Sequence, residues 1–167
     1  MAWTTPRTWA AGEFVTETIM NAHIRDQLNY LNDSRVKYAQ TTSNVGPTSG
    51  TTELDIITAP AFTPISATRL IKVSLHLRSL TSATVGDQFT IRIKEGATTF
   101  AEALININNS GTSGGDGKAY FALVPNATAA SHTYKATIQR ATGTGTATVS
   151  ASATGPLSIC VEDAGAA

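Results

Sequence analysis

The chain has 167 residues, 12 Lys and Arg against 12 Asp and Glu, and one cysteine. A neutral chain without a basic tract lacks the electrostatic footprint of a nucleic-acid binder, and one cysteine forms neither an internal disulfide nor a thiolate zinc site. No apolar run approaches the roughly 18 residues that span a bilayer, and we expect no signal peptide, because the first residues lack its basic and apolar regions.

Residues 1–45 form an N-terminal segment with its own character. Residues 1–11 contain Trp3 and Trp9 but show neither a helical nor a strand period, which indicates an extended arm. Thr16 is a suitable helix N-cap, and Glu17 places a negative charge in the first turn, where the helix dipole favours it. Met20, Ile24, Leu28 and Leu31 then recur at spacings of four, four and three. This pattern predicts a helix over residues 17–33.

The apolar seam of that helix is narrow, closer to a coiled-coil stripe than to the broad face of a helix on a globular core. At barely two heptads it is too short to hold a coiled coil alone. Two interpretations stay open: the helix packs on its own domain, or copies pack on each other or on a host surface. In the second interpretation Trp3 and Trp9 are anchors, since large aromatics dominate interfaces.

The remaining residues, 46–167, predict a β-domain. A polar linker over 41–52 precedes it, and beyond the linker the apolar period switches from helical to two. Alternation is clear at 70–78, 88–94, 132–140, 144–153 and 156–162, and weaker at 53–59, 99–107 and 118–124. About eight short strands with turn residues between them predict a mainly β fold, an antiparallel β-sandwich of jelly-roll type.

The residues that carry chemistry form no catalytic pattern. His23, His76 and His132 have no metal-ligand spacing, and the lone Cys160 is typical of a small packing residue. Glu162 and Asp163 are adjacent on a predicted strand, so they point to opposite faces and do not form an acid–base pair. We therefore expect no catalytic, cofactor-binding or metal site, and no enzyme activity.

The opening residues TPRTWAAGEFVT (5–16), followed by MNAHIRDQL (20–28), resemble the N-terminal module of many small virion proteins of tailed bacteriophages, especially those infecting actinobacteria. That module runs roughly TPRTW-x-AGE-x-VT and then LN-x-H-x-RDNL. Here Met20 replaces the usual Leu, and Gln27 stands where Asn is common. The ending LSICVEDAG (157–165) is similar to the terminal V-E-D-x-G phrase of such proteins.

The resemblance implies a non-enzymatic structural protein of the virion, made in the host bacterial cytoplasm and usually labelled a minor tail or fibre-like protein. Capsid decoration as a head spike, and a host-receptor or carbohydrate-binding module, remain alternatives. The partners expected are further copies in a trimer, other tail or capsid proteins, and, in the receptor alternative, a host cell-surface glycan. The residues expected to anchor or oligomerise the chain are Trp3, Trp9, Met20, His23, Ile24, Arg25, Asp26, Leu28 and Leu31.

Overall fold

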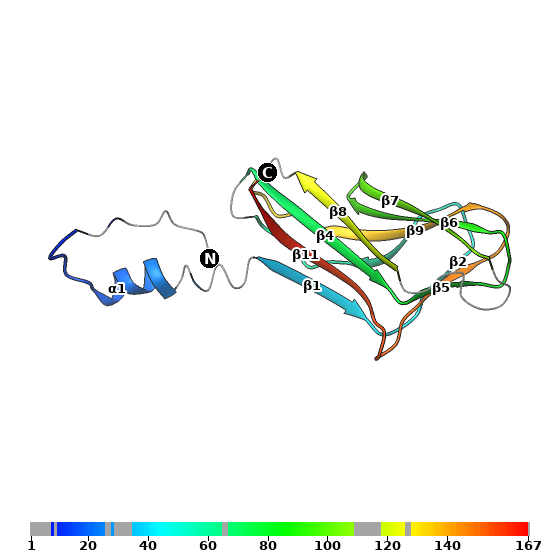
Figure 1. The fold of residues 1–167 in the computed structure, drawn as a ribbon, viewed down its shortest axis with the longest axis horizontal. Helices are drawn as coiled ribbons and strands as arrows, with labels where there is room; N and C mark the ends of the chain where they lie inside the picture. The colour runs from blue at the N-terminus through cyan, green and yellow to red at the C-terminus, as the bar shows by residue number, and fades with distance from the viewer. Residues whose placement is uncertain are drawn as a thin grey trace.

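The computed structural model describes residues 8, 10–25, 28, 35–64, 67–108, 118–125 and 128–166 (Figure 1). A short α-helix, α1 (Glu17–Met20), continues into a π-helical turn, η1 (Asn21–Arg25), and the regular elements after residue 34 are strands. The strands are β1 (Val36–Thr41), β2 (Val45–Thr48), β3 (Leu54–Thr58), β4 (Arg69–Leu77), β5 (Ser79–Ser82), β6 (Gln88–Glu95), β7 (Thr98–Asn106), β8 (Lys118–Pro125), β9 (Tyr134–Thr142), β10 (Ala147–Ser150) and β11 (Leu157–Ala166).

The strands pair as one long hairpin whose two arms run side by side. β1 pairs with β11, β2 with β10, β3 with β9, β4 with β8 and β6 with β7, all antiparallel. Further pairing of β11 with β4, β9 with β6 and β10 with β5 rolls this double strand up. The result is two four-stranded sheets, β1-β11-β4-β8 and β3-β9-β6-β7, and a small sheet β2-β10-β5. This is the jelly-roll sandwich that the sequence predicts.

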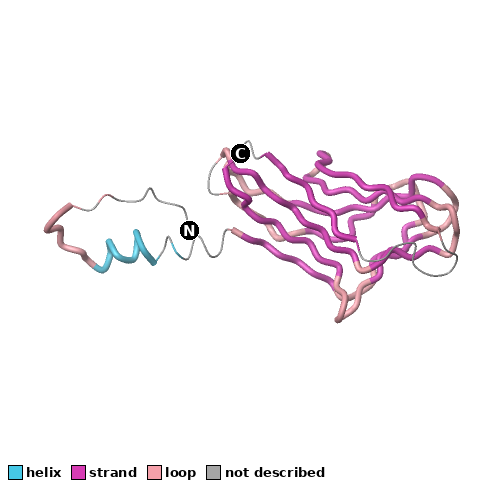
Figure 2. Tube along the Cα trace, in the orientation of Figure 1, coloured by secondary structure: helices cyan, strands magenta, loops and turns pink. Residues whose placement is uncertain are grey.

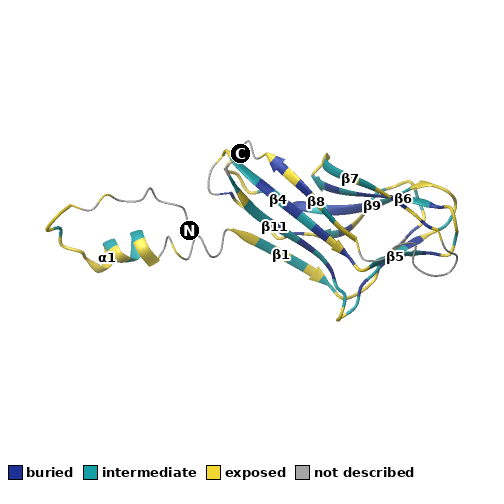
Figure 3. Cartoon of the chain, viewed as in Figure 1, coloured by how far each residue is buried: buried dark blue, intermediate teal, exposed yellow. Residues whose placement is uncertain are grey.

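The core lies between the two larger sheets and matches the predicted alternation. Ile71, Val73, Leu75 and Leu77 of β4 are at most 1% exposed, whereas His76 between them is exposed. The residues predicted to point inward from the other clear strands are buried as well: Phe89, Ile91, Ile93, Tyr134, Ala136, Ile138, Ala147, Val149, Ala151, Leu157, Ile159 and Val161. Burying each large side chain contributes about 1.5–3 kcal/mol, so this one cluster holds both sheets together (Figure 3).

The sandwich begins earlier than the boundary expected at residue 46. Strand β1 starts at Val36 and pairs along its whole length with β11, so the sheet includes residues that the sequence assigns to the N-terminal segment. The reason is that β1 is an edge strand whose inward side carries Lys37 and Ala39 rather than large apolar residues. Its period-two signal is therefore weak.

The expected linker also contains a strand, β2. Gly46 and Pro47 are typical of a turn, but Pro is tolerated on an edge strand, and β2 lies at the edge of its sheet. Gly46 adopts φ +120°, and a Cβ placed there would come within 2.9 Å of the Ala147 carbonyl oxygen. The close approach of β2 to β10 thus requires glycine at this position.

The helical segment departs from the uniform helix expected over residues 17–33. Only Glu17–Met20 is α-helical, Asn21–Arg25 forms the π-turn, and Leu28 is again helical; residues 26, 27 and 29–34 lie outside the described residues. Neither α1 nor η1 contains a buried residue. Among the described residues, no buried side chain therefore holds α1 and η1 to a strict α-helical period.

Loops gather at the ends of the sandwich (Figure 2). One group lies beside the start of β1 and the end of β11, which is the end that leads to the helical segment (Figure 1). The other group lies at the far end, around the small sheet β2-β10-β5. The sandwich therefore has one end next to the helical segment and a distal end.

Candidate functional site

The helical segment presents its apolar residues to solvent. Thr16 caps it as predicted, because the Ile19 backbone N–H donates a hydrogen bond of 3.3 Å to Thr16 Oγ1. Met20, Ile24 and Leu28 are 43%, 41% and 61% exposed. Burial of such side chains is worth about 1.5–3 kcal/mol each, so a row of three in solvent marks a surface suited to a partner.

The structure describes five of the nine residues expected to anchor or oligomerise the chain: Met20, His23, Ile24, Arg25 and Leu28. Trp3, Trp9, Asp26 and Leu31 lie outside the described residues. The His23 Nδ1 atom is enclosed without a hydrogen-bond partner among the described residues, and Arg25 is exposed. The five described residues thus lie together on one short helical segment.

The C-terminal phrase VEDAG lies in β11, at the end of the sandwich that is next to the helical segment. Glu162 and Asp163 point to opposite faces of β11, as expected. Glu162 accepts a hydrogen bond of 2.6 Å from Lys72 Nζ on the outer face. The Asp163 carboxylate, 1% exposed, accepts bonds of 2.8 and 3.0 Å from Arg69 Nε and of 3.0 Å from the Gly165 backbone N–H.

Asp163 also contacts the residue at which the chain enters the sandwich. Its backbone N–H donates to the Arg35 carbonyl oxygen at 3.0 Å, one residue before β1 begins. The same residue therefore joins β11, the start of β4 and the chain that leads in from the helical segment. This arrangement gives the terminal phrase a structural role.

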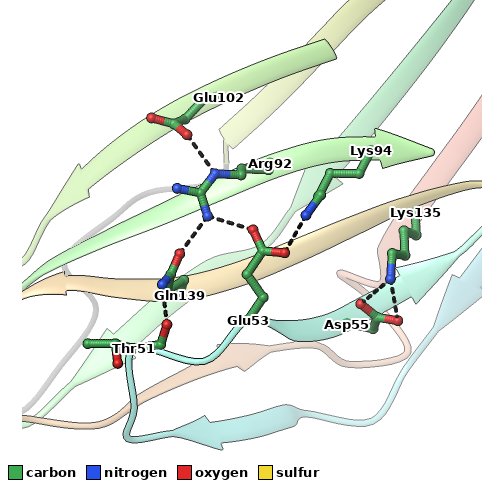
Figure 4. A network of polar contacts seen from close by, with 8 residues as sticks. All are labelled: Thr51, Glu53, Asp55, Arg92, Lys94, Glu102, Lys135 and Gln139. Carbon is green, nitrogen blue, oxygen red and sulfur yellow. Dashed lines mark hydrogen bonds and ion pairs between the residues drawn. The ribbon is translucent and has the colours of Figure 1, made fainter. Parts of the chain in front are cut away.

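The outer face of the β3-β9-β6-β7 sheet is charged, and its charges are paired (Figure 4). Arg92 is the centre of the network: its Nε donates to Glu102 at 2.6 Å, and its Nη1 donates to both Glu53 and Gln139 at 2.6 Å. Hydrogen bonding to Glu102 raises the pKa of Arg92. Lys94 contacts Glu53 as well. Each carboxylate of this face already has a cationic partner, which suits a solvated surface better than a catalytic site.

The outer face of the β1-β11-β4-β8 sheet has the opposite character. It carries four of the exposed large apolar residues of the sandwich: Val36, Tyr38, Phe121 and Leu123. The register brings Tyr38, Cys160, Ser74 and Phe121 into one row across the sheet. Sequence reasoning missed this surface, since Tyr38 and Phe121 were not recognised as neighbours; only the pairing of distant strands brings them together.

A cavity of about 220 Å³ opens between the edge strands β7 and β8. It is lined by Ile91, Ile93, Ala101, Glu102, Ala103, Ala119, Tyr120 and Phe121. Burial raises the pKa of the Tyr120 hydroxyl. Drug-sized ligands occupy pockets of about 300–1,000 Å³, so this cavity has room for a single ring or side chain.

The residues with potential chemistry are dispersed. His76 lies on the outer face of β4, and His132 Nδ1 is 2.7 Å from Glu95 Oε1 beside β9. In the described ranges, no group of three or more His, Cys, Asp or Glu side chains is placed to hold a metal ion. Cys160 is a free thiol whose pKa is raised by burial. No described helix is long and apolar enough to cross a bilayer.

Comparison with known proteins shows no family for this chain. No protein-family model matches the sequence, and no curated protein matches it. Among solved structures, the chain is similar to the VP2 subviral particle of infectious bursal disease virus, with a TM-score of 0.42 and 12% identity over 79% of this chain and 37% of that one. It is also similar to the CBM36-1 domain of a multidomain xylanase from the hindgut metagenome of Trinervitermes trinervoides, with a TM-score of 0.40 and 14% identity over 78% of this chain and 98% of that one.

The chain thus spans little more than a third of the viral chain that it matches. At such low identities and TM-scores, neither similarity bears on what this chain binds or assembles with. The class that its own strand order defines is a jelly-roll β-sandwich with an exposed N-terminal helical segment.

Proposed function

We propose that this chain is a non-enzymatic structural protein of a bacteriophage virion, a trimeric minor tail or fibre-type component attached through its N-terminal arm and helix. The observation that carries the proposal is the row of exposed apolar residues Met20, Ile24 and Leu28 on a helical segment without any buried residue. The resemblance of residues 5–28 to the N-terminal module of phage virion proteins supports it independently.

The contrast between the sandwich and the helical segment supports the same proposal. The sandwich has a complete core of its own, and its charged outer face is internally paired. The helical segment, in contrast, leaves apolar area in water. Neither α1 nor η1 contains a buried residue, so packing by a partner would stabilise this segment.

Three copies of the helical segment would satisfy one another. Met20, Ile24 and Leu28 would face a common axis, in the manner of core positions in a short coiled coil. The arm with Trp3 and Trp9 would then contact the tail or a neighbouring copy, and the sandwiches would project from the particle. The end of each sandwich next to the helical segment, where Arg35 is bonded to Asp163, would face the particle.

The test uses full-length chains with one charge added to the seam. We expect Ile24→Asp to reduce the amount of protein in purified virions at least tenfold, because it places a carboxylate among packed apolar side chains. Thr18→Asp is the matched control: it adds the same charge at an exposed position of α1 that is outside the row of Met20, Ile24 and Leu28. Incorporation of the Ile24→Asp chain at the wild-type level would contradict attachment through this segment.

A capsid-decoration protein or head spike would use the same architecture. Immunogold labelling of intact virions separates the two locations, since a tail component is labelled at the tail and a decoration protein over the head. We expect tail labelling, and head labelling would move the chain to the alternative class without changing the role of its helix.

Binding of a host cell-surface glycan is a second candidate function, favoured by one observation. The cavity between β7 and β8 has room for a single sugar ring and has Tyr120 and Phe121 in its lining; aromatic side chains of this kind stack on sugar rings. A glycan array with the wild-type chain and with Phe121→Ala tests it. Binding that disappears with Phe121→Ala supports a receptor role, and an array without any bound glycan argues against it.

A further inference from the structure

We propose that copies of this chain pack on one another through the outer face of the β1-β11-β4-β8 sheet, with Tyr38 and Phe121 as the anchors. The inference rests on the self-association proposed above and extends it from the helical segment to the sandwich. The partner is a second copy of the same chain.

The first argument is the contrast between the two sheet faces. The β3-β9-β6-β7 face is covered by Arg92, Lys94 and Lys135 with their carboxylate partners (Figure 4). Covering those residues would remove many charges from water, which is unfavourable. The β1-β11-β4-β8 face exposes Tyr38 at 51% and Phe121 at 65%. Depletion of charge around exposed aromatic residues is typical of the core of an interface.

The second argument is the arrangement of residues on this face. Three rows cross the sheet in register: Gln40, Ser158, His76 and Ala119; Tyr38, Cys160, Ser74 and Phe121; and Val36, Glu162, Lys72 and Leu123. In the middle row the two aromatic residues stand on the edge strands and the small residues lie between them. Three strand spacings separate Tyr38 from Phe121, roughly 14 Å. The middle row thus presents one exposed aromatic residue at each edge of the sheet.

The third argument is electrostatic. Lys72 and Glu162 carry the formal charges of these three rows, and they neutralise each other at 2.6 Å across β4 and β11. A partner that covers the face leaves neither charge unpaired, which is the condition under which a buried ion pair is tolerated. A face without net charge offers nothing to attract a strongly acidic or basic partner, whereas a copy of itself is equally neutral.

The fourth argument is continuity and area. β1 is both an edge strand of this sheet and the first described strand after the helical segment, so the exposed seam and this sheet face come from adjoining parts of the chain. Four strands over five residues offer roughly 300 Å² of sheet face. A stable interface buries about 800 Å² per partner. The helical seam and the sheet face are each too small alone and complement one another.

The decisive measurement is the assembly state of full-length variants by sedimentation at tens of micromolar and below. We expect the wild-type chain to form an oligomer, and Phe121→Lys and Tyr38→Lys each to weaken its assembly about tenfold or more, as the loss of an interface anchor does. Leu104→Lys is the matched control. Leu104 is 53% exposed on β7, on the outer side of the opposite sheet, so its replacement should leave assembly unchanged.

Cys160 provides a second readout, which measures access to this face rather than the assembly state. It lies in the middle row and is the one cysteine in the sequence. Its alkylation by a maleimide at pH 8.5 should be slowed at least tenfold in the assembled wild-type chain relative to Phe121→Lys. A cysteine introduced on the charged face, Lys135→Cys with Cys160→Ser, should react at the same rate in both backgrounds.

Each outcome decides the question. A monomeric wild-type chain, normal assembly of Phe121→Lys, equal weakening by Leu104→Lys, or unprotected Cys160 in the oligomer would overturn the inference. Thermal unfolding of each variant shows whether it is folded. We expect unfolding midpoints close to that of the wild-type chain, because replacing an exposed side chain changes stability little. A failure of the proposed function is measured by a different variant. In that case the Ile24→Asp chain would enter virions at the wild-type level, whatever the effect of Phe121→Lys on assembly.

Discussion

Lys94 of β6 and Lys135 of β9 lie directly opposite each other in the sheet register. Like charges in this position destabilise a sheet. Two acidic residues compensate this repulsion. Glu53, just before β3, contacts Lys94, and Asp55 of β3 lies 2.9 Å from Lys135 Nζ. The stability of this pairing therefore depends on carboxylates that are ionised, which makes it sensitive to pH.

Glu53→Gln should lower the free energy of unfolding by about 1 kcal/mol at pH 7, because it removes the charged partner of both Lys94 and Arg92. The hydrogen bond from Lys94 is the main reason that the pKa of Glu53 lies below its ordinary value of 4.5. A carboxyl group with a lowered folded-state pKa stabilises the fold above its unfolded pKa, and this contribution is lost as the pH falls through the folded pKa. Urea unfolding at a series of pH values should show the difference disappear below pH 4.5.

Asp55→Asn is the control for that experiment. The Asp55 side chain is 54% exposed and has one partner, Lys135, so its replacement should change the free energy of unfolding by less than about 0.5 kcal/mol. An effect of Asp55→Asn as large as that of Glu53→Gln would show that the shared position of Glu53 between two cations is unimportant.

Asp163→Asn should destabilise the chain by about 2–3 kcal/mol, because it leaves the mostly buried Arg69 guanidinium without an anionic partner. The side chains of Asp163 and Arg69 are 1% and 17% exposed. The neighbouring Glu162→Gln is a matched control in the same strand, and we expect it to change stability by less than about 0.5 kcal/mol, since Lys72 is 42% exposed. Denaturant unfolding of both variants measures the contrast; equal effects would refute the role given to Asp163.

The strands that the sequence predicts correctly are those whose inward residues are large. β4 and β6 alternate Ile, Val, Leu or Phe with polar residues, and the burial follows that alternation except at Thr90 of β6, which is buried as well. β1, β2 and β5 escaped prediction for local reasons: small or polar inward residues in β1, Gly46 and Pro47 in β2, and only four residues in β5. A pattern of hydrophobicity locates a strand when its core contacts are made by its own large side chains.

The candidate sites divide in the same way. The seam of Met20, Ile24 and Leu28 is local, and its spacing alone predicts it. The row from Tyr38 to Phe121 depends on strand order, which composition and period do not contain. The contact between Arg69 and Asp163 likewise joins residues 94 positions apart. Long-range register, which is fixed only when the sandwich closes, creates these sites.

Gly143→Ala should destabilise the chain more than Gly86→Ala. Both glycines have positive φ, +93° and +86°, so alanine is strained by about 1 kcal/mol at either position. A Cβ at Gly143 would lie 1.8 Å from Asp87 Oδ1, whereas a Cβ at Gly86 meets nothing within 4 Å. The displaced Asp87 carboxylate accepts bonds from the Thr144 and Gly145 backbone N–H groups.

We therefore expect Gly143→Ala to lose about 1–3 kcal/mol beyond the backbone strain, because the buried Asp87 carboxylate loses these two hydrogen bonds. Thermal unfolding of the two variants side by side measures the excess. Equal midpoints would mean that the Asp87 carboxylate moves aside without loss and that its hydrogen bonds do not hold the distal loops.

Tyr134→Phe should increase the free energy of unfolding by about 1 kcal/mol at pH 7, because the buried Tyr134 hydroxyl has no hydrogen-bond partner among the described residues. Burial also raises the pKa of Tyr134 to about 12. A group with a raised folded-state pKa contributes its stability fully below the unfolded pKa, near 10, and loses it as the pH rises toward 12. The advantage of Tyr134→Phe should therefore widen between pH 10 and pH 12.

Urea unfolding at pH 7 and at pH 11 tests both parts of this prediction. Tyr38→Phe is the control: Tyr38 is half exposed and donates to Gln40, so the change should alter stability at pH 7 by less than about 0.5 kcal/mol. Because phenylalanine keeps the ring, the packing of residue 134 against His132 and Phe100 is preserved. A loss of stability at pH 7 on Tyr134→Phe would show instead that the hydroxyl is satisfied in solution, by an enclosed water molecule for example, and that the hydroxyl stabilises this end of the core.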